Sequence, residues 1–266
     1  MNPPVFRTIE VSDPRFELEG LRWITVKSPA LRQRADLTLF VPPKVAELRD
    51  VQLVILLHGV YGSHWAWALK GGAHRTAAKL IETGQIPPMV LAMPSDGLWG
   101  DGSGYLRHPE QDFERWIIEE VPAAAQAACS ALSSSSPRFI SGLSMGGFGA
   151  LRLAAKYPGR FRGAGGHSSM THFEQHTQFV EELLDSYACP PEDRSVFDTM
   201  LNNRDRLPPI RFDCGTEDPL LEVNRQLHAQ LDSAGIAHQY VEFPGGHEWP
   251  YWEAHVKDML LFFADC

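Results

Sequence analysis

The chain has 266 residues, of which 44% are hydrophobic and 21% are charged, and a formal net charge of −9. This length and composition are typical of one soluble α/β domain, and the negative charge argues against nucleic acid or an anionic membrane as the main partner. The chain has no run of eighteen apolar residues, and Met1–Arg7 lacks the apolar segment of a signal peptide, so we expect a cytoplasmic protein. The four cysteines, at positions 129, 189, 214 and 266, lack the C-x-x-C spacing of a zinc site and indicate no disulfide framework.

Strands and helices are expected to alternate along the chain. Two early segments, 21–27 and 35–41, are rich in apolar and β-branched residues and predict an antiparallel pair of strands. The apolar run 51–57 is too short for a helix and is typical of a strand buried on both faces of a parallel sheet. Further strands are predicted at 89–93, 139–141, 163–166, 210–214 and 238–243, and helices at 73–82, 112–132, 147–156, 220–234 and 252–263. The alternation predicts a single α/β domain over residues 1–266, with a mostly parallel sheet and helices on both faces.

Residues 170–208 interrupt this alternation, because they contain helical patterns but no clear strand. An insertion after a strand of a parallel sheet often covers the active site as a lid. A peripheral helical excursion is the alternative, and the sequence leaves both open.

The segment Gly142-Leu143-Ser144-Met145-Gly146 follows an apolar strand and precedes a helical pattern. This context is typical of a nucleophile elbow, a tight strand-to-helix turn that exposes a serine hydroxyl. Glycine is needed on both sides because the neighbouring backbone approaches too closely for side chains. The alternative is an ordinary glycine-rich loop at a strand end. The assignment therefore depends on whether the sequence also supplies a base and a carboxylate for Ser144.

A serine hydroxyl becomes a nucleophile only when a base takes its proton and a carboxylate orients that base. On a sheet with a nucleophile elbow the chain order is serine, acid, histidine. Asp218 lies just past the predicted strand 210–214 and is preferred to Asp213 and Glu217, although it also suits a helix N-cap. Of the eleven histidines, His247 follows the last predicted strand, after two glycines, and is the predicted base.

Two backbone N–H groups are expected to form an oxyanion hole for this serine. One is the N–H of Met145, which comes with the elbow. The other should come from the loop His58-Gly59-Val60-Tyr61-Gly62 after the strand 51–57, with Val60 as the predicted donor and Tyr61 as the alternative. His58 itself is interpreted as a structural brace for this loop.

With these residues identified, the chain resembles the putative-esterase family of α/β-hydrolases, which includes S-formylglutathione hydrolases (esterase D-like), feruloyl and acetyl-xylan esterases, and mycolyltransferases. The resemblance runs from about residue 20 to the end, and its matching stretches are 56–67, 92–97, 119–122, 141–147 and the loops of Asp218 and His247. It implies an α/β-hydrolase fold and hydrolysis of esters or thioesters through an acyl-enzyme on Ser144, with His247 as base and then acid and Asp218 as its orienting group. No cofactor or metal is implied.

Tryptophans gather in the loops expected around Ser144, at positions 65, 67, 99, 249 and 252. Tyr61, Trp65 and Trp249 are the predicted substrate-binding residues, because exposed aromatic rings suit a flat acyl group or a sugar; packing of loops against the core is the alternative. We therefore expect a serine esterase for small or phenolic acyl groups. A thioesterase such as S-formylglutathione hydrolase, an acyltransferase and a non-catalytic binding protein are the alternatives, and a homodimer is one candidate for the oligomeric state.

Overall fold

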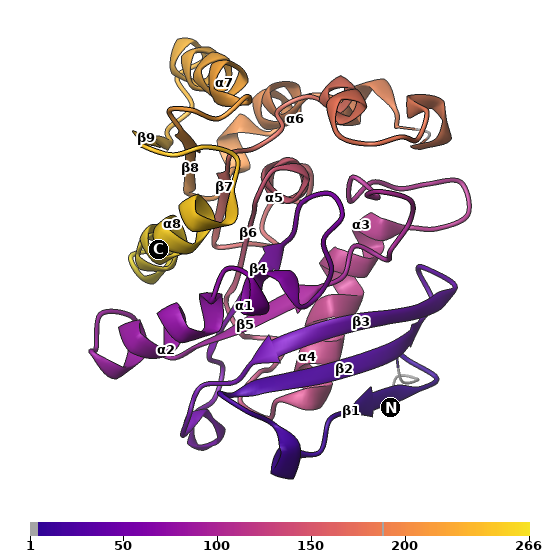
Figure 1. Cartoon of the computed structure of the whole chain (residues 1–266), viewed down its shortest axis with the longest axis vertical. Helices are drawn as coiled ribbons and strands as arrows, with labels where there is room; N and C mark the ends of the chain where they lie inside the picture. Colours follow the sequence, from indigo (N-terminus) through magenta and orange to yellow (C-terminus); the bar gives the residue numbers. More distant parts are fainter. Residues whose placement is uncertain (1–4, 188) are drawn as a thin grey trace.

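The computed structural model describes residues 5–187 and 189–266, and a nine-stranded sheet runs through this part of the chain (Figure 1). The strand order is β1-β2-β3-β5-β4-β6-β7-β8-β9. β1, β2, β3 and β5 pair antiparallel, and from β5 to β9 every pairing is parallel, so the sheet is mostly parallel as predicted. The strands are β1 (Ile9–Val11), β2 (Leu21–Ser28), β3 (Gln33–Phe40), β4 (Gln52–Leu57), β5 (Met89–Pro94), β6 (Arg138–Gly142), β7 (Gly163–His167), β8 (Ile210–Gly215) and β9 (Gln239–Phe243).

Helices cover both faces of the sheet. One hydrophobic core holds Leu53, Ile55 and Leu57 of β4 with the helices α4 to α7, and the other holds Val54 and Leu56 with α1, α2 and α8. Because successive side chains of a strand point to opposite faces, the continuous apolar run of β4 supplies both cores. The helices are α1 (Ala66–Leu69), α2 (Ala73–Glu82), α3 (Phe113–Arg115), α4 (Val121–Ala128), α5 (Met145–Lys156), α6 (Val196–Asn202), α7 (Leu221–Ser233) and α8 (Trp249–Ala264). No helix in the described part of the chain combines the length and apolarity needed to cross a membrane.

The predicted helix over 112–132 differs from the structure in two ways. It is divided into α3, a π-helical turn at Trp116–Glu120 and α4, and it ends at Ala128, where Cys129 turns to an extended backbone. Pro122 has no N–H and so cannot supply the regular α-helical bond at this point. The Val121 N–H instead reaches the Trp116 carbonyl, which widens the turn.

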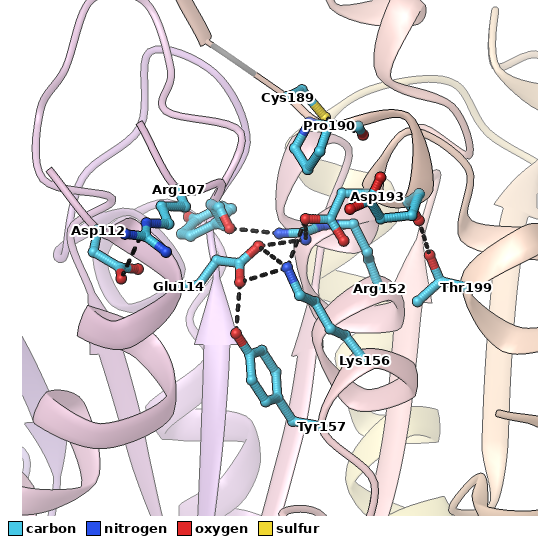
Figure 2. A network of polar contacts seen from close by, with 12 residues as sticks. Arg107, Asp112, Glu114, Arg152, Lys156, Tyr157, Cys189, Pro190, Asp193 and Thr199 are labelled. Atoms are coloured by element: carbon cyan, nitrogen blue, oxygen red, sulfur yellow. Dashed lines mark hydrogen bonds and ion pairs between the residues drawn. The ribbon is translucent and has the colours of Figure 1, made fainter. Parts of the chain in front are cut away.

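Residues 170–208 hold α6 and short 3-10 turns, and no strand lies among the residues that the structure describes there. The 3-10 turns in this insertion are Phe173–Gln178, Leu184–Tyr187, Pro191–Asp193 and Arg204–Arg206. Figure 2 shows how the insertion is held against α5: Asp193 accepts a hydrogen bond from Lys156 Nζ at 2.5 Å and lies 3.7 Å from Arg152 Nη1. The later half of the insertion is therefore fixed to the helix that follows Ser144.

Candidate active site

Ser144 lies in a strained turn between β6 and α5. Its φ is 54° and its ψ is −118°, a conformation that L-residues rarely adopt. Neither neighbouring glycine can carry a side chain, because a Cβ on Gly142 would stand 2.3 Å from the Gly146 carbonyl oxygen and one on Gly146 would stand 2.4 Å from that of Leu57. This close packing explains the spacing of the two glycines. The Ser144 hydroxyl lies at the N-terminus of α5, where the helix dipole stabilises a developing negative charge.

The structure brings Ser144, His247 and Asp218 together from three loops at the carboxyl edge of the parallel strands. Ser144 Oγ lies 3.0 Å from His247 Nε2, and His247 Nδ1 lies 2.9 Å from Asp218 Oδ2. The alternatives lie elsewhere: Asp213 is buried against His167 at 2.9 Å, and Glu217 is exposed. A continuous chain of hydrogen bonds thus runs from the serine hydroxyl to the Asp218 carboxylate.

The Asp218 carboxylate is held in its charged form. Burial by itself raises the pKa of this carboxyl, but the hydrogen bonds from His247 Nδ1 and from the Leu220 N–H outweigh it, so the pKa is lowered. The His247 ring is held between two aromatic side chains, stacked on Phe179 at 5.7 Å between centroids and edge-on to Trp252 at 5.1 Å. The ring is therefore oriented by Asp218 and by packing together.

The loop after β4 passes directly beside the serine, since a Cβ built on Gly59 would lie 3.3 Å from Ser144 Cβ. His58 braces this loop as expected: it is buried, its Nδ1 donates to the Gly59 carbonyl at 2.6 Å, and its Nε2 accepts from the Asp96 N–H at 3.0 Å. The Tyr61 N–H already donates to the Asp101 carbonyl at 2.9 Å. In the loops and turns of the described residues, no backbone carbonyl accepts from the Val60 or Met145 N–H, which leaves both as the expected oxyanion donors.

A cavity of about 250 Å³ opens beside Ser144 and is mostly walled by aromatic and apolar side chains. Tyr61, Trp65 and Trp249, the residues predicted to bind substrate, all line it. Phe179, Lys70 and Trp252 line it as well; Trp252 was noted among the tryptophans near the site, whereas sequence reasoning missed the other two. Trp67 and Trp99 do not line this cavity: Trp67 is buried and donates to the Leu57 carbonyl, and Trp99 packs on His108 and Tyr187.

Three segments far apart in the sequence meet beside this cavity, whose wall includes Tyr61 and Phe179. The Tyr61 hydroxyl donates to the Phe179 carbonyl at 2.8 Å, the Glu181 N–H donates to Asp101 Oδ2 at 2.8 Å, and the Asp101 N–H donates to Glu182 Oε1 at 3.1 Å. Asp101 thus links the loop after β4 to the first half of the insertion. The 100–105 loop contacts Tyr61 through this residue.

Comparisons with known proteins extend this description. A family model described as "Putative esterase" matches residues 28–263. The chain is 27% identical over 240 residues to an acetyl esterase of Caldicellulosiruptor saccharolyticus, covering 83% of this chain and 86% of that protein. An S-formylglutathione hydrolase from Staphylococcus aureus has a similar structure, with a TM-score of 0.78, 16% identity and coverage of 97% and 99% of the two chains. A ferulic acid esterase from Anaeromyces mucronatus gives a TM-score of 0.70 at 16% identity, with coverage of 96% and 98%.

Proposed function

Because the chain belongs to the putative esterase family and has the α/β-hydrolase fold, we propose that it is a serine carboxylesterase with Ser144 as nucleophile, His247 as base and Asp218 as orienting acid. The observation that carries the proposal is the hydrogen-bonded chain from Ser144 Oγ through the two ring nitrogens of His247 to Asp218. The strained backbone of Ser144 and the two glycines beside it also support the proposal, because three polar side chains that met by chance would not require this costly turn.

The reaction begins when His247 Nε2 takes the hydroxyl proton as Ser144 Oγ bonds to the ester carbonyl carbon. The carbonyl oxygen becomes an oxyanion and accepts hydrogen bonds from the Val60 and Met145 N–H groups. The carbon–oxygen bond to the alcohol then breaks, and His247 returns its proton to the leaving alcohol. Water attacks the acyl-enzyme in the same way, with His247 as base again, and releases the acid while Asp218 stabilises the imidazolium in both halves.

The acyl group is proposed to be small or phenolic. A cavity of about 250 Å³ with Tyr61, Trp65 and Trp249 in its wall suits an acetyl group or one aromatic ring. The relative described as an acetyl esterase and the similar structure of a ferulic acid esterase agree with this range. Thioester hydrolysis is the second candidate, supported by the similar structure of an S-formylglutathione hydrolase, and acyl transfer to an alcohol would use the same residues.

The test is hydrolysis of a panel of acetyl, butyryl, feruloyl and formyl-thioester substrates by the purified protein. We expect acetyl or feruloyl esters to be cleaved fastest, and Ser144→Ala to abolish both hydrolysis and labelling by a fluorophosphonate probe. Hydrolysis that survives in Ser144→Ala would refute the assignment of the nucleophile. A preference for the formyl thioester, or acceleration by an added alcohol, would replace the carboxylesterase with one of the two alternatives.

A further inference from the structure

Two histidines and an aspartate lie together at the sheet edge opposite the Ser144 site. His228 and Asp232 lie one helical turn apart on α7, and His238 directly precedes β9. The loops of Asp218 and His247 follow the carboxyl ends of β8 and β9. His238 lies at the other end of β9, its amino end, away from these loops. Within the described residues, this is the one group of three or more His, Cys, Asp or Glu side chains whose ligand atoms all lie within 4.8 Å of one another.

The separations in this cluster are close to those of metal ligands when each side chain offers one atom. His228 Nδ1 lies 2.8 Å from His238 Nε2, and His238 Nε2 lies 3.9 Å from Asp232 Oδ1. One ligand atom from each of the three side chains lies within 4.8 Å of the other two. Around a tetrahedral ion with metal–nitrogen bonds of about 2.0 Å, neighbouring ligand atoms stand about 3.3 Å apart. Small side-chain movements would therefore be enough to enclose an ion.

His238 is already oriented as a ligand. Its side chain is only 2% exposed, and its ring stacks on Phe212 with 5.6 Å between centroids. Its Nδ1 lies 2.8 Å from the Ile236 carbonyl, and since a carbonyl can only accept, Nδ1 carries the proton. The lone pair of Nε2 therefore faces His228 and Asp232. A ring nitrogen held by a backbone carbonyl is the usual support of a metal-binding histidine.

We propose that His228, Asp232 and His238 bind a divalent transition-metal ion of the zinc type, with water completing the coordination. Two imidazole ligands favour such an ion over Ca²⁺ or Mg²⁺, which prefer oxygen ligands. The His228 and Asp232 side chains are 40% and 65% exposed, so they are free to adjust around the ion. Binding requires the His228 tautomer with its proton on Nε2, because Nδ1 is then free to face the ion beside His238 Nε2.

The ion would have a structural effect rather than a catalytic one. It would join α7 to the start of β9 across the turn at 234–237, far along the strands from Ser144. An ion that binds the folded chain raises its free energy of unfolding. Metal binding and esterase activity can therefore be measured as separate properties of the same protein.

The experiment titrates the full chain, freed of metal with EDTA, with ZnCl₂ by calorimetry and follows its melting temperature. We expect one Zn²⁺ per chain and a melting temperature higher by about 5 °C when free Zn²⁺ exceeds its Kd a hundredfold. His228→Ala and Asp232→Asn should each weaken binding by about tenfold or more while hydrolysis of p-nitrophenyl acetate stays unchanged. These two variants are preferred to His238→Ala, whose buried side chain supports folding.

His255→Ala is the matched control, because His255 forms a similar contact with Asp258, at 3.0 Å on α8, without a second histidine. This variant should bind Zn²⁺ as the unchanged chain does. The proposal is overturned if the unchanged chain binds no Zn²⁺, or if His228→Ala and Asp232→Asn bind it as well as His255→Ala does. Neither result would bear on Ser144, since the esterase assay is scored independently.

Discussion

At the scale of single residues, the proposed triad depends on the carboxylate of Asp218. It is buried, accepts from His247 Nδ1 and the Leu220 N–H, and has a lowered pKa, so it stays charged through neutral and mildly acidic pH. The sequence predicted this residue because it follows a strand and precedes a helix. It could not predict the role of Phe179, because stacking on His247 depends on how the insertion folds back over the sheet.

Replacing Asp218 by Asn should leave the fold intact and lower kcat by about 10³–10⁴-fold, since the amide favours the wrong tautomer of His247 and cannot stabilise its positive charge. Because the carboxylate is charged over the whole assay range, the loss should be similar at pH 6 and pH 8 in steady-state hydrolysis of p-nitrophenyl acetate. Glu217→Gln is the control, an exposed neighbour of the same charge that should retain full activity. Equal losses in both variants would exclude Asp218 as the orienting acid.

At the scale of elements, patterns within a segment were predictive and contacts between segments were not. β4, β6 and α5 follow from short apolar runs and the glycines around Ser144, because each signal is local. β1 gave no signal, since its three residues are at best half-buried. α8 begins at Trp249 rather than at the predicted residue 252, because Pro250 is tolerated in the first helical turn, where its missing N–H costs nothing.

The link between the loop after β4 and the insertion leads to a prediction on Asp101. Its side chain accepts from the Glu181 N–H, and its carbonyl accepts from Tyr61, whose φ is 56°. Asp101→Ala should loosen this contact and misplace the adjacent Val60 N–H, lowering kcat by about tenfold, a fraction of the loss expected when an oxyanion donor is removed.

The measurement is kcat and KM separately for a small acetyl ester. A positioning role predicts that kcat falls more than KM rises. Asp185→Ala is the control, an exposed acidic residue of the same insertion, and should change neither constant. An unchanged kcat in Asp101→Ala would show that the loop after β4 holds its conformation without the insertion.

At the scale of the whole molecule, the fold class was predictable because alternating strands and helices leave few arrangements, but the polar network that ties distant parts together was not. Arg152 of α5 is fully buried and donates to Glu114 Oε1 at 2.5 Å (Figure 2). It also donates to the Tyr105 carbonyl at 2.6 Å. Lys156 links Glu114 to Asp193 of the insertion. These residues lie far apart in the sequence, and no spacing rule connects them.

This network predicts how stability depends on pH. Burial by itself raises the pKa of Glu114, but the charges of Arg152 and Lys156 and the hydrogen bond from the Tyr157 hydroxyl outweigh it and lower the pKa to about 2, from an ordinary value of 4.5. A carboxyl whose pKa is lower in the folded state stabilises the fold above the unfolded pKa, and this contribution is lost as pH falls from about 4.5 towards 2. Glu114→Gln should therefore cost about 3–5 kcal/mol at pH 7, because it leaves Arg152 buried beside an uncharged amide.

Urea unfolding of both proteins between pH 7 and pH 3 measures this difference. The gap in the free energy of unfolding should be constant down to about pH 5 and narrow below it, because acid neutralises Glu114 only in the unchanged chain. Glu119→Gln is the control: its pair with Arg115 is exposed at 53% and 50%, so its effect should stay below about 1 kcal/mol. A gap that does not change with pH would mean that Glu114 supports the fold through packing and hydrogen-bond geometry rather than through its charge.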